Sequence, residues 1–113
     1  MTLTNKGAFE LLQYMSNLHE TGKLGFFIAK NMRMIKTEIQ EYIALRDHTI
    51  SKYAAPGGVA VADENIPLFL EEMRPYDEIE CEIDPAQVDE ALFISGTLNS
   101  KDMFNLDWMV KAE

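Results

Sequence analysis

The 113-residue sequence lacks most of the features that identify a secreted or membrane-bound protein. Its one cysteine, Cys81, cannot form an internal disulfide, and this scarcity is typical of a reducing compartment. No run approaches the roughly 18 apolar residues of a membrane-spanning helix, and the first residues carry no apolar signal core. We therefore expect a cytoplasmic protein that makes no membrane contact.

Residues that would indicate catalysis are equally scarce. Neither His19 nor His48 has a cysteine or histidine at ligand spacing, and the serines and threonines have no partnering histidine and acid. Gly57-Gly58 lacks the lysine and the following helix of a phosphate-binding loop. Cys81 alternates with glutamates, which raise the pKa of a thiol and weaken it as a nucleophile. The sequence predicts no catalytic residue, metal site or cofactor, and favours a protein that is not an enzyme.

Charge, in contrast, is plentiful and unevenly distributed. The net charge is −9, divided as 0 over residues 1–25, +2 over 26–53 and −11 over 54–113. An acidic surface maintains solubility, and it also attracts basic protein surfaces and repels nucleic acid. Direct binding of DNA or RNA is not expected, because phosphate neutralisation needs clustered lysine and arginine. We expect the +2 segment to dock against the −11 segment.

One amphipathic segment, residues 26–54, is the most prominent feature of the chain. Apolar or long side chains recur every three or four residues, which predicts a single α-helix: Ile28, Met32, Ile35, Ile39, Tyr42, Ile43, Arg46, Ile50 and Tyr53. Such a helix is about 43 Å long, whereas a compact globule of this chain length is about 35 Å across. The helix must project from the domain or be covered in part by a partner.

The remaining elements are short. We predict a first helix over residues 5–20 with Thr4 as N-cap, and Gly22 as the left-handed residue at its end. A short strand over 59–61 and a helix over 66–73 come next, and the chain breaks at 74–76. A strand over 78–83 pairs with the strand over 59–61, and helices over 84–96 and 100–111 follow it. The first helix covers half of the long helix, and the last one covers the far half. The fold class is a mostly helical α+β domain spanning 1–113, with an αα-hairpin over 1–54 and an acidic strand–helix cover over 55–113.

Four carboxylates in and beside the predicted strand form the strongest chemical pattern: Glu78, Glu80, Glu82 and Asp84. Alternate side chains on a strand lie about 6.6 Å apart, too far for neighbours to share a proton or a metal ion. Three interpretations remain: an edge strand protected from aggregation, a surface that imitates a phosphate backbone, and a polar contact with a basic partner.

Three further residues are candidates for a partner-binding surface. Phe26 and Phe27 add apolar surface beside the main stripe of the long helix, which suggests burial on two sides by the domain or by another chain. Arg46 is the one charged side chain on that stripe, so it either packs its stem with an exposed head, pairs with an internal carboxylate or lies in an interface.

The order of elements resembles a family of small, functionally uncharacterised proteins encoded by tailed phages and prophages of Gram-positive bacteria. The resemblance covers about residues 26–110 and consists of a long helix ending Ser51-Lys52-Tyr53, a glycine-containing turn, the acidic segment 77–83 and the closing segment 106–110. It implies phage origin and expression in the host cytoplasm, and it brings no activity or catalytic residues.

These observations predict a non-enzymatic protein–protein interaction module, a phage accessory protein that presents helix faces to a partner or to another copy of itself. The alternative is an acidic anti-defence inhibitor that occupies the basic nucleic-acid groove of a host enzyme. A small enzyme is the third class, and for it no pair of complementary acid–base groups can be named.

Overall fold

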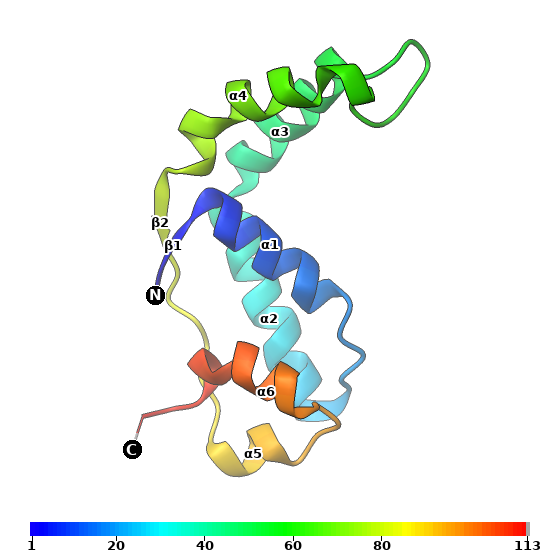
Figure 1. Ribbon diagram of the computed structural model, residues 1–113. Coiled ribbons are helices and arrows are strands. Elements are labelled where there is room, and N and C mark those ends of the chain that lie inside the picture. Colours follow the sequence, from blue (N-terminus) through cyan, green and yellow to red (C-terminus); the bar gives the residue numbers. More distant parts are fainter. Residues whose placement is uncertain (113) are drawn as a thin grey trace.

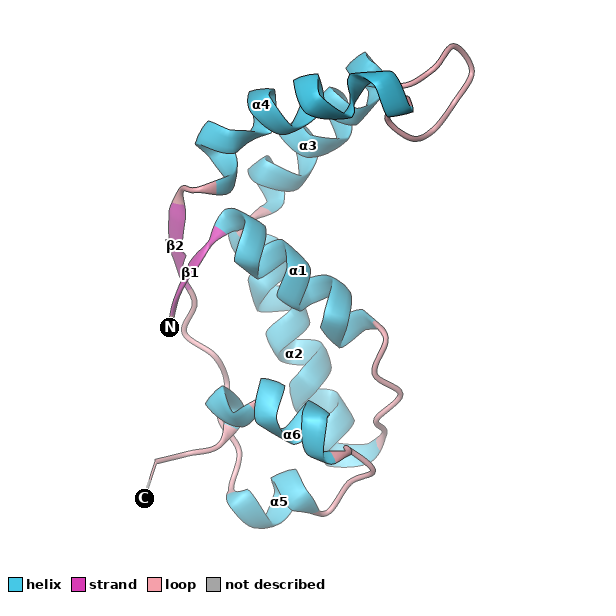
Figure 2. Ribbon diagram, in the orientation of Figure 1, coloured by secondary structure: helices cyan, strands magenta, loops and turns pink. Residues whose placement is uncertain are grey.

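The computed structural model describes residues 1–112 and is an elongated molecule measuring 50 × 25 × 21 Å. Figure 1 shows two parts along the long axis. The first, the body, contains helices α1, α2, α5 and α6 and a small sheet. The second, the arm, contains α3, α4 and the loop between them. Figure 2 shows that helices dominate both parts, and the mostly helical α+β class is confirmed.

Helices α1 (Asn5–Ser16) and α2 (Gly22–Glu38) form the predicted hairpin. Thr4 is the N-cap of α1, as predicted, and its hydroxyl accepts a hydrogen bond from the Gly7 N–H at 3.0 Å. The helix ends four residues earlier than expected. Gly22 has a φ of +69°, the left-handed conformation predicted for it, but it begins α2 instead of ending α1.

The prediction of a single helix over residues 26–54 is wrong. The segment divides at Ile39 into α2 and α3 (Gln40–Tyr53), and Ile39 has φ −107° and ψ 20°. Helical hydrogen bonds continue through the bend, from the Ile39 N–H to the Ile35 carbonyl and from the Ile43 N–H to the Ile39 carbonyl. No glycine or proline causes this bend. It occurs where α2 stops packing on α1 and α3 starts packing on α4, with Ile39 buried at the change of partner.

Helix α4 (Ile66–Asp77) follows the short 3-10 turn η1 (Asp63–Asn65) and packs on α3. The acidic half therefore covers the far part of the long segment, as predicted, but α4 does this and the last helix does not. The predicted break at 74–76 is also wrong, because Pro75 lies within α4 and the helix continues to Asp77. Pro75 removes one N–H, and the neighbouring helical turns remain intact.

The sheet has two strands, β1 (Thr2–Thr4) and β2 (Glu80–Glu82), in antiparallel register with Leu3 opposite Cys81. The predicted partner of the acidic strand, residues 59–61, is therefore wrong. Val61 instead forms an isolated bridge with Ala54, which closes the loop at the tip of the arm. Both strands alternate, with the middle residue turned inward, so the N-terminal segment satisfies the same period-two pattern.

The end of the chain returns to the body. The predicted helix over 84–96 is reduced to α5 (Glu90–Ile94), and the one over 100–111 becomes α6 (Ser100–Asn105) and the 3-10 turn η2 (Asp107–Met109). Residues 84–88 form no helix because Asn31, fully buried on α2, is hydrogen-bonded to both backbone groups of Ala86, at 2.8 Å and 3.0 Å. A hydrogen bond from the Tyr14 hydroxyl to Asp102 joins α6 to α1, so α6 covers the body and not α3.

Candidate interaction surfaces

The predicted carboxylates lie along one exposed edge of the molecule. We call residues 76–84 the acidic strip. Four of its five carboxylates are exposed, those of Glu78, Glu80, Glu82 and Asp84, and that of Asp77 is half-buried. Glu80 and Glu82 belong to β2, whereas Glu78 caps the end of α4 and Asp84 follows the strand. Of the four carboxylates predicted in and beside one strand, two therefore lie on the strand and the other two lie on either side of it.

Apolar side chains accompany the acids of this strip. Ile79, expected on the buried side of the strand, is 52% exposed, because the strand begins only at Glu80, and Tyr76 is 42% exposed. Cys81 is half-buried and Ile83 is buried, as the alternation predicts. Exposed apolar groups rimmed by charge are typical of a protein-binding surface.

Only one acid of the strip has a cationic partner within the chain. Glu82 accepts a hydrogen bond from the Thr2 hydroxyl and lies 3.6 Å from the Met1 ammonium, and the hydrogen bond is the main reason that the pKa of this carboxyl is lowered. Across residues 1–112, no ion pair forms at Glu78, Glu80 or Asp84.

A second charged surface, the basic face of α2, was missed by sequence reasoning. We define it by the exposed cations Lys23, Lys30, Arg33 and Lys36, together with Phe26. Helix α2 carries only one acid, Glu38, so its net charge is +3 in a chain of −9. The sequence does contain the signal, because lysine or arginine recurs at positions 23, 30 and 33, but the predicted helix began at 26 and included the acids of α3.

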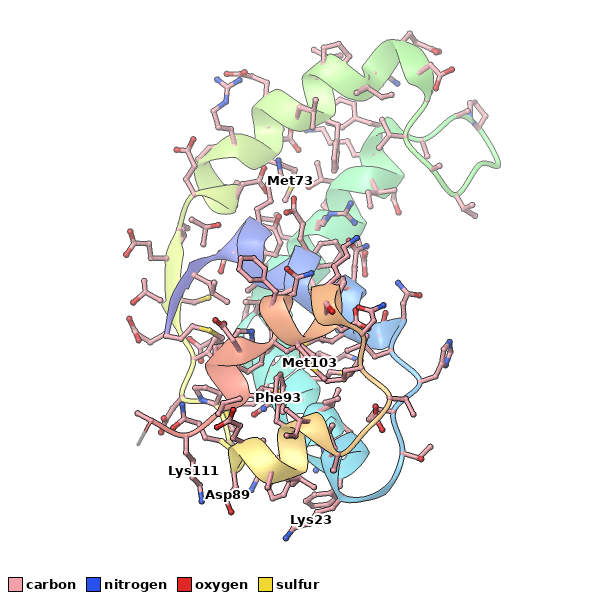
Figure 3. All side chains as sticks on the ribbon, turned by 60° about the horizontal axis from the view of Figure 1, so that its bottom comes forward. Lys23, Met73, Asp89, Phe93, Met103 and Lys111 are labelled. Carbon is pink, nitrogen blue, oxygen red and sulfur yellow. The ribbon has the colours of Figure 1, made fainter. Side chains whose placement is uncertain are left out.

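The basic face lies opposite the buried side of α2. Leu24, Ile28, Asn31 and Ile35 point into the body, and α1 lies over α2 in Figure 1. Figure 3 shows Lys23 projecting outward at the end of the molecule, beside α5. In the part of the chain that the structure describes, none of the four cations is in an ion pair.

The two phenylalanines differ in their surroundings. Phe26 is 63% exposed on the basic face, whereas Phe27 is half-buried against the core. Their rings meet edge to face, with centroids 5.4 Å apart and an interplanar angle of 82°. The domain therefore covers one side of this pair, and Phe26 remains available.

Arg46 lies at the junction of body and arm and not on either charged surface. Its guanidinium carbon is 4.4 Å from the ring centroid of Phe9 on α1 and 6.0 Å from that of Phe69 on α4. Of the three alternatives for Arg46, the pair with an internal carboxylate is absent among the described residues, and the cation lies over aromatic rings instead. Nearby, the Tyr42 hydroxyl donates a 2.5 Å hydrogen bond to Asp77, which also joins α3 to α4.

The docking expected between the +2 and −11 segments relies on little charge. Lys52 and Glu72 form its one ion pair between α3 and α4 in residues 1–112, at 2.7 Å, and Glu72 also accepts from the Tyr53 hydroxyl. Apart from this pair and the hydrogen bond from Tyr42 to Asp77, the contact involves buried or half-buried apolar groups such as Phe69 and Met73.

No group of acidic, histidine and cysteine side chains within residues 1–112 is arranged to hold a metal ion. Cys81 has a raised pKa, and its burial contributes more to that shift than the glutamates that the sequence indicated. No described helix is long and apolar enough to span a membrane. The candidate functional surfaces are therefore the acidic strip and the basic face of α2.

Comparison with protein-family models, with curated proteins and with solved structures finds no match to this chain.

Proposed function

We propose that this chain is a non-enzymatic protein–protein interaction module, a phage accessory protein that acts through helix-face contacts with a partner or with another copy of itself. The observation that supports this most directly is the basic face of α2. Four exposed cations and an exposed phenylalanine stand together on one helix, uncovered by any described element.

The composition of this face favours a protein partner over nucleic acid. Four cations can neutralise a few phosphates, but the same chain carries fourteen acids in residues 54–113, and these repel a long polyanion. A protein surface can present an acidic patch of limited size. Phe26 adds aromatic contact area, which is enriched at protein interfaces.

Two measurements test the proposal. Size-exclusion chromatography with light scattering over a wide concentration range detects self-association, and pull-down from a Gram-positive host lysate detects other partners. Replacing Phe26 with serine should reduce whichever association is found, whereas the same change at exposed Phe104 on α6 provides the matched control. A strict monomer that captures no host or phage protein would contradict the proposal.

The alternative, an acidic inhibitor that fills the basic groove of a nucleic-acid enzyme, is favoured by one observation. Glu78, Glu80 and Asp84 are exposed and form no ion pair in the described chain. Replacing Glu78, Glu80 and Glu82 with glutamine should abolish capture of such an enzyme. Capture that continues unchanged and is insensitive to salt would exclude this electrostatic mechanism.

A further inference from the structure

We propose that the basic face of α2 docks on the acidic strip of a second copy of this chain. This inference rests on the proposed function and specifies its contact. The surfaces are opposite in charge and each includes exposed apolar groups. Within the described chain, no cation of the basic face is in an ion pair, and Glu82 is the one acid of the strip that is.

The two surfaces match in length and in number of charges. Lys23 and Lys36 are thirteen residues apart on a helix, which is about 20 Å at 1.5 Å per residue. Glu78 and Asp84 are six residues apart in mostly extended chain, which is at most about 20 Å at 3.3 Å per residue. Four cations can therefore face four carboxylates over the same span.

The apolar groups on each surface add contact area that charge alone does not supply. Phe26, 63% exposed, stands between Lys23 and Lys30 along the helix. Ile79 and Tyr76, each more than two-fifths exposed, stand at the start of the acidic strip. An aromatic group among cations and apolar groups among acids can pack together while the charges pair around them.

The contact requires a second copy, because one chain cannot form it with itself. The basic face is turned away from α1, whereas β2 pairs with β1, the strand that leads directly into α1 (Figure 1). None of the four cations reaches a carboxylate of its own chain within residues 1–112. A second copy provides the acidic strip that the first cannot reach.

Such a contact joins two different surfaces. Two copies related by a two-fold axis form it twice in a closed dimer, and copies related in any other way form a ring or an open chain. Two copies of net charge −9 repel each other at long range. Salt near physiological strength screens charges more than about 8 Å apart, whereas pairs in contact are screened less. Assembly is therefore expected at moderate salt and should weaken at high salt.

Charge-reversal variants test this contact. Arg33→Glu and Glu80→Lys should each weaken self-association by about tenfold or more, because each places like charges opposite one another. An equimolar mixture of the two variants should recover association, since the intact basic face of the Glu80→Lys variant can dock on the intact acidic strip of the Arg33→Glu variant. Lys101→Glu and Glu64→Lys, which change exposed residues outside both surfaces by the same charge, should leave association unchanged.

The outcomes separate this contact from the proposed function. Loss of self-association in both variants, with its recovery in the mixture, supports the contact between the basic face and the acidic strip. Oligomers that persist in both variants, or that resist high salt, refute this contact and leave the interaction module standing. A wild-type monomer at every concentration also refutes it, and pull-down then decides whether the proposed function survives with another protein.

Discussion

Replacing Asn31 with aspartate should destabilise the protein at neutral pH and much less at acidic pH. The Asn31 amide is fully buried, accepts from the Ala86 N–H at 2.8 Å and donates to the Ala86 carbonyl at 3.0 Å. An ionised carboxylate keeps the first hydrogen bond but places a negative oxygen against the carbonyl. A protonated carboxyl restores both bonds, because its hydroxyl donates where the amide donated.

The magnitude follows from the pKa of the new carboxyl. Burial can raise such a pKa by about three units above the unfolded value of about 3.9, and each unit corresponds to about 1.4 kcal/mol. The free energy of unfolding should therefore fall by about 4 kcal/mol at neutral pH. Because the folded pKa is the raised one, the deficit develops above the unfolded pKa, and it disappears as pH falls back toward that value.

Urea unfolding followed by circular dichroism, with variant and wild type compared at each pH, measures this difference. Because the other carboxylates titrate in both proteins, their contribution to the free energy of unfolding cancels in the difference. Asn17→Asp is the exposed control. The Asn17 amide donates to the Gln13 carbonyl at 3.1 Å at the end of α1, so this variant should also lose stability as its carboxyl ionises, but by only about 1 kcal/mol. A difference at Asn31 that stays constant between acidic and neutral pH would refute the buried double hydrogen bond.

Three other predictions concern the body–arm junction and the sheet. Replacing Tyr42 with phenylalanine removes its hydrogen bond to Asp77 and should lower the free energy of unfolding, measured in urea, by about 1–2 kcal/mol. Burial raises the pKa of this phenol, so the stabilisation that it gives the wild-type protein should be lost only as pH rises above about 10, and spectrophotometric titration of the phenol checks this. Replacing Arg46 with methionine keeps the stem but removes the cation over Phe9, and should lower the free energy of unfolding by about 0.5–2 kcal/mol. The raised pKa of Cys81 should make its alkylation slow in the folded protein and fast in urea, and equal rates would contradict its half-burial.

Local signals in the sequence were sufficient for the elements that depend on local chemistry. Thr4 caps α1 because a hydroxyl precedes a helical pattern, and Gly22 takes a left-handed conformation that side chains disfavour. The acidic strand was found from its alternation of glutamate with Cys81 and Ile83. These features need no information from distant parts of the chain.

The features that the sequence did not reveal depend on distant contacts. Strand β1 has three residues, too few to show a clear period, and its partner lies almost eighty residues away. The segment 84–88 has helix-start chemistry at Asp84-Pro85, yet Asn31 of α2 holds its backbone in another conformation. The bend at Ile39 follows from packing on two different helices, so no local breaker accompanies it.

Of the two candidate surfaces, the acidic strip was predicted from the sequence and the basic face was not. Carboxylates alternating along a strand are visible as a pattern, and their exposure agrees with it. The cations of α2 are more widely spaced, and their grouping on one face becomes clear only when the helix begins at Gly22 and ends at Glu38. Once α3 is recognised as a separate helix, its acids are no longer counted in the net charge of α2.

The bend at Ile39 also explains why the positive charge of α2 and α3 and the negative charge of residues 54–113 form few ion pairs inside the molecule. Of six cations on α2 and α3, Lys52 alone forms an ion pair in the described chain. Arg46 is satisfied by aromatic rings, and α4 covers α3 mainly through apolar contacts, so the acidic half reaches only the arm. The remaining four cations stay on α2, on the side that no helix covers. The charge of +3 on α2 therefore forms no ion pair with the acidic strip in the described chain, and this is the charge that the proposed contact with a second copy would pair.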